Sequence, residues 1–536
     1  MGLHSKKSIW QAISSRRFLI LILLSVILFF MRLGSISVYQ VAEARNAACA
    51  REMLLRDDWV VPTFNGALRT DKPALEYFAM MIAYQFGGIN EGSARFFSAL
   101  CGLLLILATF LFAKRHLGSE VAWWSALVLL ASPHLVTQFR LATPDPYLIL
   151  SDTLALYCFL EGWLRDKRRT AWYLGMYAFL GLALLAKGPI GLLLPGLILF
   201  VFLLCKRQLR FKTLLGLRPW GILLTGAIAA PWYILVHLRT DGAWTRGFFL
   251  AHNVGRFSDA MGGHGGLFLL TLAFVLAGML PFSVFFVHVF SHTIKRIREH
   301  DLWLFCLISV CVIVGFYAVS RTKLINYTVP CYPFLALMTG MFFSRLLSGG
   351  KRPLKALWVV LMLWAVIGLA VPVAFWLWTH MNDDLATFTW LTPFFLIYPV
   401  GTGIALWYFA RKKFRHGLYA VTGTFIAGTI LLQAYPYPYM DGYTPMRKAE
   451  TLWAEHKTIA AYQRFNPAFV FYVGHPIPLL KDSTEVREFL QHHPRALILS
   501  NARNQDPLTR LSSLQLIRRD REIFNSHTSW IYRHSP

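Results

Sequence analysis

The sequence is poor in charged residues, and poorest in acidic ones. Only 15% of its 536 residues are charged, and 27 Asp and Glu stand against 53 Lys and Arg, for a formal net charge of +26. Cysteine is also scarce, with seven residues scattered without the spacing of a metal site. A soluble chain of this length needs more polar surface, and an odd, scattered cysteine set argues against a disulfide framework.

Apolar residues take the place of the missing charge. They make up 56% of the chain, and the mean hydropathy is +0.48. Several apolar runs approach or exceed the roughly 20 residues that a membrane-spanning helix needs. We therefore expect a polytopic α-helical membrane protein with about 13 transmembrane helices. The predicted spans lie near 18–34, 96–113, 121–139, 146–164, 171–186, 189–205, 219–238, 267–290, 302–319, 327–347, 355–379, 390–410 and 417–434.

The basic residues lie in short clusters between the apolar runs. This distribution argues against a nucleic-acid partner and is typical of cytoplasmic loops that contact anionic lipid. With the N-terminus in the cytoplasm, every even-numbered span is followed by such a cluster, and no cleavage site follows the first span. The sequence thus predicts a multi-pass membrane protein whose C-terminus lies on the side of the membrane away from the cytoplasm. The clusters are Lys114–His116, Arg165–Arg169, Lys206–Arg207, Lys295–Arg296, Arg345 with Lys351–Arg352, and Arg411–Lys413.

Two domains are expected. Residues 1–435 form the transmembrane domain, which includes a periplasmic first loop at 35–95 with helices over Ala42–Arg56 and Ala74–Phe86. Residues 436–536 are more polar and predict a small soluble periplasmic α/β domain.

In this tail, two short apolar runs predict buried strands and two longer stretches predict helices. The predicted strands are Ala468–Val473 and Ala496–Ser500, and the predicted helices are Ala449–Gln463 and Glu485–His492.

Ionisable residues from distant parts of the chain fall on the outer face in this topology. Such residues at membrane depth are costly and usually functional. Carboxylates there can activate an acceptor or bind a metal, while Lys and Arg can neutralise a phosphate leaving group. Each also has a structural alternative: a solvated helix face, a helix cap, a snorkelling lysine or a packed histidine. The residues are Glu43, Arg45, Asp71, Lys72, Asp145, Lys187, His252, Arg256, Lys323 and Tyr327. Asp152 and Glu161, inside the fourth span, are interpreted as polar contacts between helices.

Several segments, in order, resemble a known family. The first loop, EARNAACAREMLLRDDWVVPTFNGALRTDKPALEYF, is similar to that of the dolichyl-phosphate-mannose–protein mannosyltransferase-like superfamily, and closest to bacterial lipid A aminoarabinose transferases. LATPDPYL, AKGPIGLLLPGL, FFLAHNVGRF and SRTKLINYTVPCYPFLAL also match, over about residues 20–345. Each segment is weak alone, and their shared order makes the combination specific.

The resemblance implies a GT-C fold and a glycosyltransferase. Such an enzyme moves a sugar from a polyprenyl-phosphate donor to a lipid A-like, glycan or protein acceptor on the periplasmic face. Carried over by position, Asp71 and His252 correspond to a pair that binds a divalent metal (Zn, or Mg/Mn). Lys72 and Arg256 correspond to donor-phosphate ligands with Tyr327 nearby, and Asp145 is an acidic residue of the acceptor site.

One departure from the family pattern concerns catalysis. The family's first-loop Asp aligns with Ala42, which leaves only the adjacent Glu43. We expect direct displacement at the anomeric carbon, with Glu43, Asp145 or both orienting or deprotonating the acceptor. Arg45 and Lys323 are further expected phosphate ligands. If the acceptor is an ionised phosphate, no strong base is needed.

Two alternatives stay open. A transporter or flippase of lipid-linked sugars would also be polytopic, but it is expected to show internal repeats and midplane polar residues. The other alternative is a catalytically weakened homologue that acts as a binding subunit. It stays open because Ala42 stands where the family has its catalytic Asp. The sequence does not identify the sugar, the acceptor or the oligomeric state.

Overall fold

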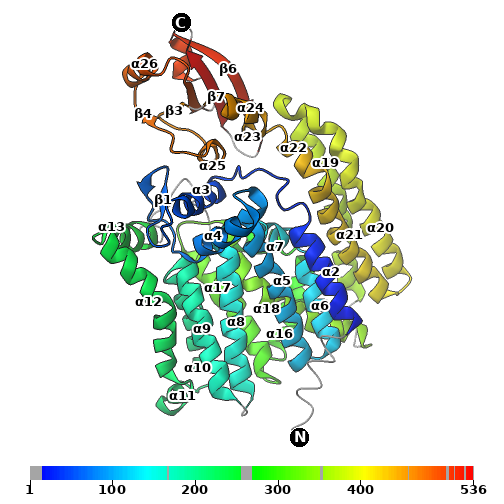
Figure 1. The fold of residues 1–536 in the computed structure, drawn as a ribbon. Coiled ribbons are helices and arrows are strands. Elements are labelled where there is room, and N and C mark those ends of the chain that lie inside the picture. The colour runs from blue at the N-terminus through cyan, green and yellow to red at the C-terminus, as the bar shows by residue number, and fades with distance from the viewer. Residues whose placement is uncertain are drawn as a thin grey trace.

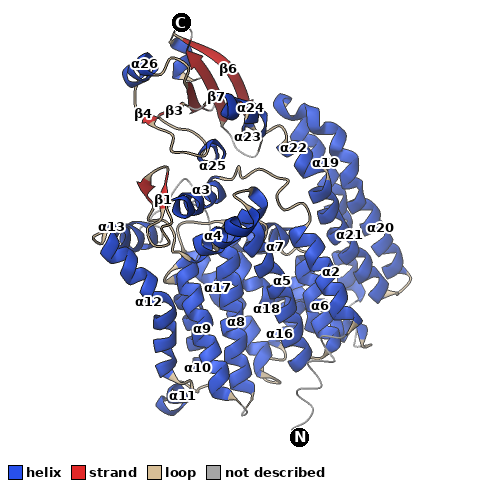
Figure 2. Ribbon diagram, in the orientation of Figure 1, coloured by secondary structure: helices blue, strands red, loops and turns tan. Residues whose placement is uncertain are grey.

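The computed structural model describes residues 15–165, 168–254, 268–349, 354–456, 458–502, 506–511, 513–523 and 527–534. Most of the chain is a bundle of long helices, and a small sheet domain stands over one end of it (Figure 1). Colouring by secondary structure separates the two parts, since the strands gather almost wholly in the C-terminal region (Figure 2). The predicted fold class, a helical bundle with a small C-terminal α/β region, is confirmed.

The bundle follows the predicted spans in order, some of them broken into two elements. Its apolar helices pack on one extended core that runs from α2 to α21. The elements are α2 (Arg16–Phe30), α5 (Glu91–His116), α6 (Ser119–Leu130), α7 (Pro133–Gln138), α8 (Asp145–Leu164), α9 (Arg169–Lys187), α10 (Ile190–Cys205), α11 (Phe211–Gly216), η1 (Pro219–Gly221), α12 (Ile222–Arg239), α13 (Ala243–Arg246), η2 (Gly247–Val254), α15 (Phe268–Gly278), η4 (Phe282–Phe285), α16 (Phe286–Ile294), α17 (Asp301–Val319), η5 (Ile325–Cys331), α18 (Tyr332–Leu347), α19 (Leu354–His380), η6 (Asp383–Leu396), α20 (Ile397–Ala410) and α21 (Phe414–Ala434).

By length and composition, eight helices within the described ranges are able to cross a membrane, or up to nine if the bent pair α15 and η4–α16 counts as one span. Four other apolar helices, α2, α6, α10 and α18, have 12 to 16 residues. The predicted number of about 13 spans therefore stays a prediction.

Helix α8 is the central element of the bundle. It is buried along almost its whole length, as expected for a helix that is apolar on every side. Near its far end, Glu161 accepts hydrogen bonds from Arg115 (3.1 Å) and pairs with His116 (2.9 Å), both in the last turn of α5. Glu161 thus makes the polar contact between helices that its position predicts. The other end of α8 begins at Asp145, which faces the candidate site.

The first loop forms two helices joined by a small hairpin. α3 (Val41–Leu55) and α4 (Leu75–Gly87) confirm the two predicted loop helices, and β1 (Thr63–Phe64) pairs antiparallel with β2 (Ala67–Leu68). Figure 1 shows α3, α4 and β1 between the bundle and the C-terminal domain, and α11 at the opposite end of the bundle. The long loop and the tail therefore share one end of the molecule, as the predicted topology requires.

The C-terminal domain is built on a five-stranded mixed sheet in the order β4-β3-β5-β7-β6. β3 is parallel to β4 and β5, while β7 runs antiparallel to β5 and β6, with Ile459 opposite Leu497 and Leu499 opposite Ile531. The elements are α22 (Pro436–Asp441), α23 (Pro445–Lys448), α24 (Glu450–Glu455), β3 (Ile459–Tyr462), α25 (Ala468–Val473), β4 (Leu479–Leu480), α26 (Ser483–His492), β5 (Leu497–Ala502), η7 (Pro507–Arg510), β6 (Leu514–Arg521) and β7 (Thr528–His534).

Two predictions for this domain are confirmed, one is wrong and one is half right. The strand near Ala496–Ser500 and the helix near Glu485–His492 are present as β5 and α26. The segment Ala468–Val473 is a helix, α25, and not a strand. Its N-terminus follows Pro467, the Asn466 side chain accepts the Ala468 amide (2.9 Å), and Gly474 ends it at φ +90°. These flanking residues are helix start and stop signals that outweigh the β propensity of AFVFYV.

The predicted helix over Ala449–Gln463 ends early. Only Glu450–Glu455 is helical, and Ile459–Tyr462 forms the buried strand β3. A fully buried, parallel-paired strand has a continuous apolar sequence, which periodicity alone does not distinguish from a helix.

Candidate functional site

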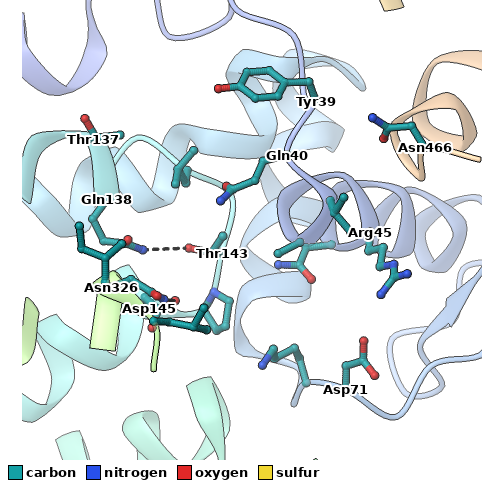
Figure 3. A pocket seen from close by; sticks show the side chains of 18 of the residues that line it. Tyr39, Gln40, Arg45, Asp71, Thr137, Gln138, Thr143, Asp145, Asn326 and Asn466 are labelled. Carbon is teal, nitrogen blue, oxygen red and sulfur yellow. Dashed lines mark hydrogen bonds between the residues drawn. The ribbon is translucent and has the colours of Figure 1, made fainter. Parts of the chain in front are cut away.

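A cavity of about 660 Å³ lies where the first loop, the bundle and the C-terminal domain meet. Figure 3 shows polar side chains from all three regions around it. Most of the wall belongs to the bundle and the first loop, and the C-terminal domain closes one side. The polar lining residues are Tyr39, Gln40, Arg45, Asn46, Arg69, Asp71, Lys72, His134, Thr137, Gln138, Thr143, Asp145, Lys187, Thr322, Asn326, Tyr327, Thr444, Asn466 and Glu522.

Asp145 is held firmly on the bundle side of the cavity. Its carboxylate is 2.5 Å from the Lys187 ammonium and accepts a hydrogen bond from the Asn326 amide at 2.9 Å. Asp145 is the first residue of α8, where the helix dipole favours a negative charge. Two side chains from other elements therefore orient the carboxylate at the cavity wall.

Lys187 is positioned by the end of its own helix. It is the last residue of α9, where a positive charge is favoured, and its ammonium lies 4.8 Å from the centre of the Tyr327 ring. Gly188 follows with φ +79°, and a side chain there would meet Phe248 at 2.5 Å. The AKGP segment thus allows a close turn that places Lys187 beside Asp145.

The loop side of the cavity is mainly cationic. In Figure 3, Arg45 and Asp71 lie on one side, opposite Asp145 and Asn326. The guanidinium carbons of Arg45 and Arg69 are each 6.0 Å from the centre of the Phe64 ring, and Arg69 is 3.6 Å from the Asp71 carboxylate. Burial, and then the nearby charge of Arg69, lower the pKa of Arg45. Positive charge is thus concentrated here around one acidic residue.

A buried network supports Arg69 from behind. The Asn46 carbonyl oxygen accepts a hydrogen bond from Arg69 (2.7 Å), and its amide nitrogen donates to Glu76 (3.1 Å) and to the Ala142 carbonyl (3.1 Å). Glu76 is fully buried, and burial raises the pKa of its carboxyl group to about 8 against the lowering effect of Arg69. Burial thus favours the protonated carboxyl group of Glu76, a form that offsets less of the positive charge of Arg69.

The structure does not bring Glu43 to the cavity. Its carboxylate forms a two-point ion pair with Arg95 (2.7 and 2.9 Å) and accepts the Ala142 amide at 2.9 Å, with 1% of the side chain exposed. Arg95 also donates to the carbonyls of Leu33, Ile36 and Ser37. Glu43 thus joins α3 to α5 and to the loop before α8, whereas its neighbour Ala42 lines the cavity.

Lys323 is also engaged elsewhere. Its ammonium donates to the carbonyls of Ala318 (2.9 Å) and Ser320 (2.7 Å), so it caps the C-terminus of α17. Lys323 is buried and does not appear among the lining residues, although Tyr327 does. Its geometry is that of a helix cap and not that of a phosphate ligand.

Two of the expected ligands, Arg256 and His252, lie wholly or partly outside the residues that the structure describes. Arg256 lies outside the described residues, and of His252 only the backbone, in η2, is described. The described residues hold no group of three or more His, Cys, Asp and Glu that is able to bind a metal. The expected metal pair of Asp71 and His252 therefore stays a prediction.

Sequence reasoning missed several lining residues. Arg69 lies two residues before Asp71, so its position in the sequence could have indicated that it belongs to the same site. Asn466 and Glu522 come from the C-terminal domain, more than 370 positions along the chain from the first loop, and nothing in their local sequence marks them. Tyr39, whose hydroxyl is 2.6 Å from that of Tyr437, is another lining residue that sequence reasoning missed.

Comparison with known proteins finds similarity to membrane glycosyltransferases. Residues 71–235 match the model of the dolichyl-phosphate-mannose-protein mannosyltransferase family. An uncharacterized protein of Aquifex aeolicus is 27% identical over 491 residues, which is 90% of this chain and 91% of the relative. The undecaprenyl phosphate-alpha-4-amino-4-deoxy-L-arabinose arabinosyl transferase of Pectobacterium atrosepticum is 27% identical over 360 residues, 66% of this chain and 64% of that protein.

Solved structures show the same fold. ArnT from Cupriavidus metallidurans, in a crystal structure bound to undecaprenyl phosphate, superposes with a TM-score of 0.80 at 21% identity, covering 96% of this chain and 97% of that one. The archaeal oligosaccharyltransferase AglB from Archaeoglobus fulgidus reaches 0.51 at 14% identity, covering 93% of this chain and 70% of that one. The resemblance to GT-C glycosyltransferases close to the lipid A aminoarabinose transferases is confirmed, and so is the glycosyltransferase class.

Proposed function

We propose that this GT-C glycosyltransferase moves an amino-pentose of the 4-amino-4-deoxy-arabinose type from undecaprenyl phosphate to a lipid acceptor. The observation that carries the proposal is the cavity, in which Asp145 and the cations of the first loop face one space. Relatives named as undecaprenyl-phosphate arabinosyl transferases support a polyprenyl-phosphate donor and a pentose.

In the proposed reaction an acceptor oxygen attacks the anomeric carbon of the donor sugar. The bond from that carbon to the phosphate oxygen breaks, and polyprenyl phosphate leaves with the electron pair. Lys72 and Tyr327 line the cavity and support the assignment of a donor-phosphate position there. A cation beside the leaving phosphate stabilises the negative charge that develops on it.

Asp145 is the carboxylate that we assign to the acceptor. Its partners, Lys187 and Asn326, fix its direction. It orients the acceptor oxygen by hydrogen bonding, and it takes the proton if that oxygen is a hydroxyl. Glu43 has no free oxygen facing the cavity, so we assign it a structural role through Arg95.

For the location, a multi-pass protein of the bacterial inner membrane is supported by the apolar helices and by the relatives. We place the N-terminus in the cytoplasm and the cavity and C-terminal domain in the periplasm. The cavity lies at the loop end of the bundle, while the basic last turn of α5 lies at the other end of that helix.

The test is sugar transfer by the purified chain in detergent. Radiolabelled undecaprenyl-phosphate aminoarabinose is the donor and lipid A the acceptor, and the variant Asp145→Asn is compared with Asp383→Asn. Asp383 is an exposed residue of η6 at the same end of the molecule, and its replacement removes a charge without touching the cavity. We expect transfer by the chain and by Asp383→Asn, and a loss of at least about 100-fold for Asp145→Asn.

Transfer from a polyprenyl-phosphate hexose, with none from the pentose donor, would replace the pentose assignment. Accumulation of intact donor on the other side of sealed vesicles, without transfer, would favour the transporter alternative.

A further inference from the structure

Arg69 is a buried cation that lines the cavity and has unused hydrogen-bonding capacity. Only 7% of it is exposed, and its Nε and one Nη atom have no hydrogen-bond partner among the described residues. A buried guanidinium in this condition is costly, because charge-bearing donors have lost water without replacement. Such a group is explained if a ligand in the cavity accepts those hydrogen bonds.

Arg45 is the second cation of this wall. It lies near the same Phe64 ring as Arg69, and no hydrogen bond or ion pair joins it to any residue in the described part of the chain. Ala42 lies three positions earlier on α3, so the two share one helix face, and both line the cavity. A carboxylate at position 42, which the related family carries, would face Arg45; here the alanine leaves that guanidinium unneutralised.

The acidic residues around this wall do not cancel its charge. Asp71 is 3.6 Å from Arg69 and is the only acidic side chain of the loop side that lines the cavity in the described structure. Across the cavity, Asp145 is paired with Lys187. Glu522, from the C-terminal domain, accepts hydrogen bonds from Asn501 (2.7 Å) and Ser529 (3.0 Å). The loop side therefore keeps an excess of positive charge.

We propose that Arg69 and Arg45 form a second anion site, distinct from the donor-phosphate position, which binds the ionised phosphate of the acceptor. This inference rests on the proposed function and adds the residues that select the acceptor. Guanidinium groups bind phosphate through paired, charge-assisted hydrogen bonds, and Arg69 has two donors available for this purpose. An acceptor that arrives ionised needs no proton acceptor at position 42, which accounts for Ala42.

The test is binding, measured by native mass spectrometry on the full chain in detergent. Three probes are used: bisphosphorylated lipid A, the same lipid without phosphates, and undecaprenyl phosphate. We expect Arg69→Gln to weaken binding of the bisphosphorylated lipid about tenfold, as the loss of charge-assisted bonds implies. Binding of the dephosphorylated lipid and of undecaprenyl phosphate should stay unchanged, and Arg487→Gln, on the exposed face of α26, should bind all three probes like wild type.

Ala42→Asp provides the reciprocal test, because it restores a carboxylate beside Arg45. It should weaken binding of bisphosphorylated lipid A and leave undecaprenyl phosphate unaffected. If Arg69→Gln fails to fold, Arg45→Gln at the more exposed guanidinium carries the same comparison.

Wild-type affinity of Arg69→Gln or Arg45→Gln for the phosphorylated lipid would overturn the proposal. A loss of undecaprenyl phosphate binding would also overturn it, since the arginines would then belong to the donor. If the wild-type chain transfers no sugar, the proposed function is refuted. The binding comparison between wild type and Arg69→Gln still decides whether the anion site exists.

Discussion

The pair of Asp145 and Lys187 gives the sharpest test of which residues do chemistry. Their charged atoms are 2.5 Å apart, and the side chains are only 9% and 12% exposed. Removing one partner of such a pair leaves the other charge buried without compensation, which costs about 3–5 kcal/mol. We therefore expect Asp145→Asn and Lys187→Met each to lower the free energy of unfolding by about 3 kcal/mol. The double variant should recover most of this loss, because no unpaired charge remains.

Stability and transfer should then respond differently. Unfolding in detergent by a chemical denaturant, followed by tryptophan fluorescence, measures the first, and initial rates of sugar transfer measure the second. The double variant should be folded like wild type and still transfer sugar at least about 100-fold more slowly, since the carboxylate that orients the acceptor is absent. A double variant that regains both stability and transfer would refute the assignment, because Asp145 would then be needed only to neutralise Lys187.

Three further predictions follow from the contacts around the cavity. Glu43→Gln should lower the free energy of unfolding by about 3 kcal/mol, because it weakens the buried ion pair with Arg95. The rate of sugar transfer per folded molecule should stay within about twofold of wild type. Loss of transfer in a variant as stable as wild type would make Glu43 a catalytic candidate again. Glu76 binds a proton more tightly in the folded chain (pKa about 8) than in the unfolded chain (4.5), so its contribution to stability is complete below about pH 4.5 and is lost as pH rises towards 8. Glu76→Gln should therefore make the free energy of unfolding fall less steeply over this pH range. An unchanged pH dependence of the free energy of unfolding would contradict the raised pKa. Lys323→Met should lower thermal stability by leaving the last carbonyls of α17 without a donor, and it should leave the KM for the donor unchanged; a raised KM would return Lys323 to the donor site.

The sequence was sufficient for the large features because they depend on composition over long windows. Apolar runs of 16 or more residues leave few alternatives to a helix in a membrane, and all the predicted spans coincide with helices. Basic clusters such as Lys114–His116 predicted how these spans are oriented in the membrane. The loop helices α3 and α4 were predicted from apolar residues at helical spacing. Asp145, Lys72 and Tyr327, which the order of the family's segments marks, all line the cavity.

The structure differs from expectation where a specific contact, and not the residue type, decides the outcome. Glu43 and Lys323 carry the charge that a site residue needs. The partner of Glu43 is Arg95, 52 positions away, and the partners of Lys323 are the carbonyls at the end of α17. No local pattern distinguishes a carboxylate that binds substrate from one that binds an arginine. The short segment Ala468–Val473 shows the same limit, because Asn466 and Gly474 at its ends, and not its apolar composition, determine a helix.

The C-terminal domain is bound to the first loop closely enough to belong to the site. Asn65, in the β1–β2 turn, exchanges two hydrogen bonds with Ile477 (2.9 and 2.6 Å), and the Tyr472 hydroxyl accepts the Val38 amide at 2.7 Å. One buried apolar cluster contains residues of α3, α4, α25, β3 and β5 together. The composition change near residue 436 predicts a domain boundary, but separating the two parts would expose this shared core and open the wall that Asn466 and Glu522 supply. Because this domain completes one wall of the cavity, the first loop and the tail have to be considered as one unit in any change of the residues that line it.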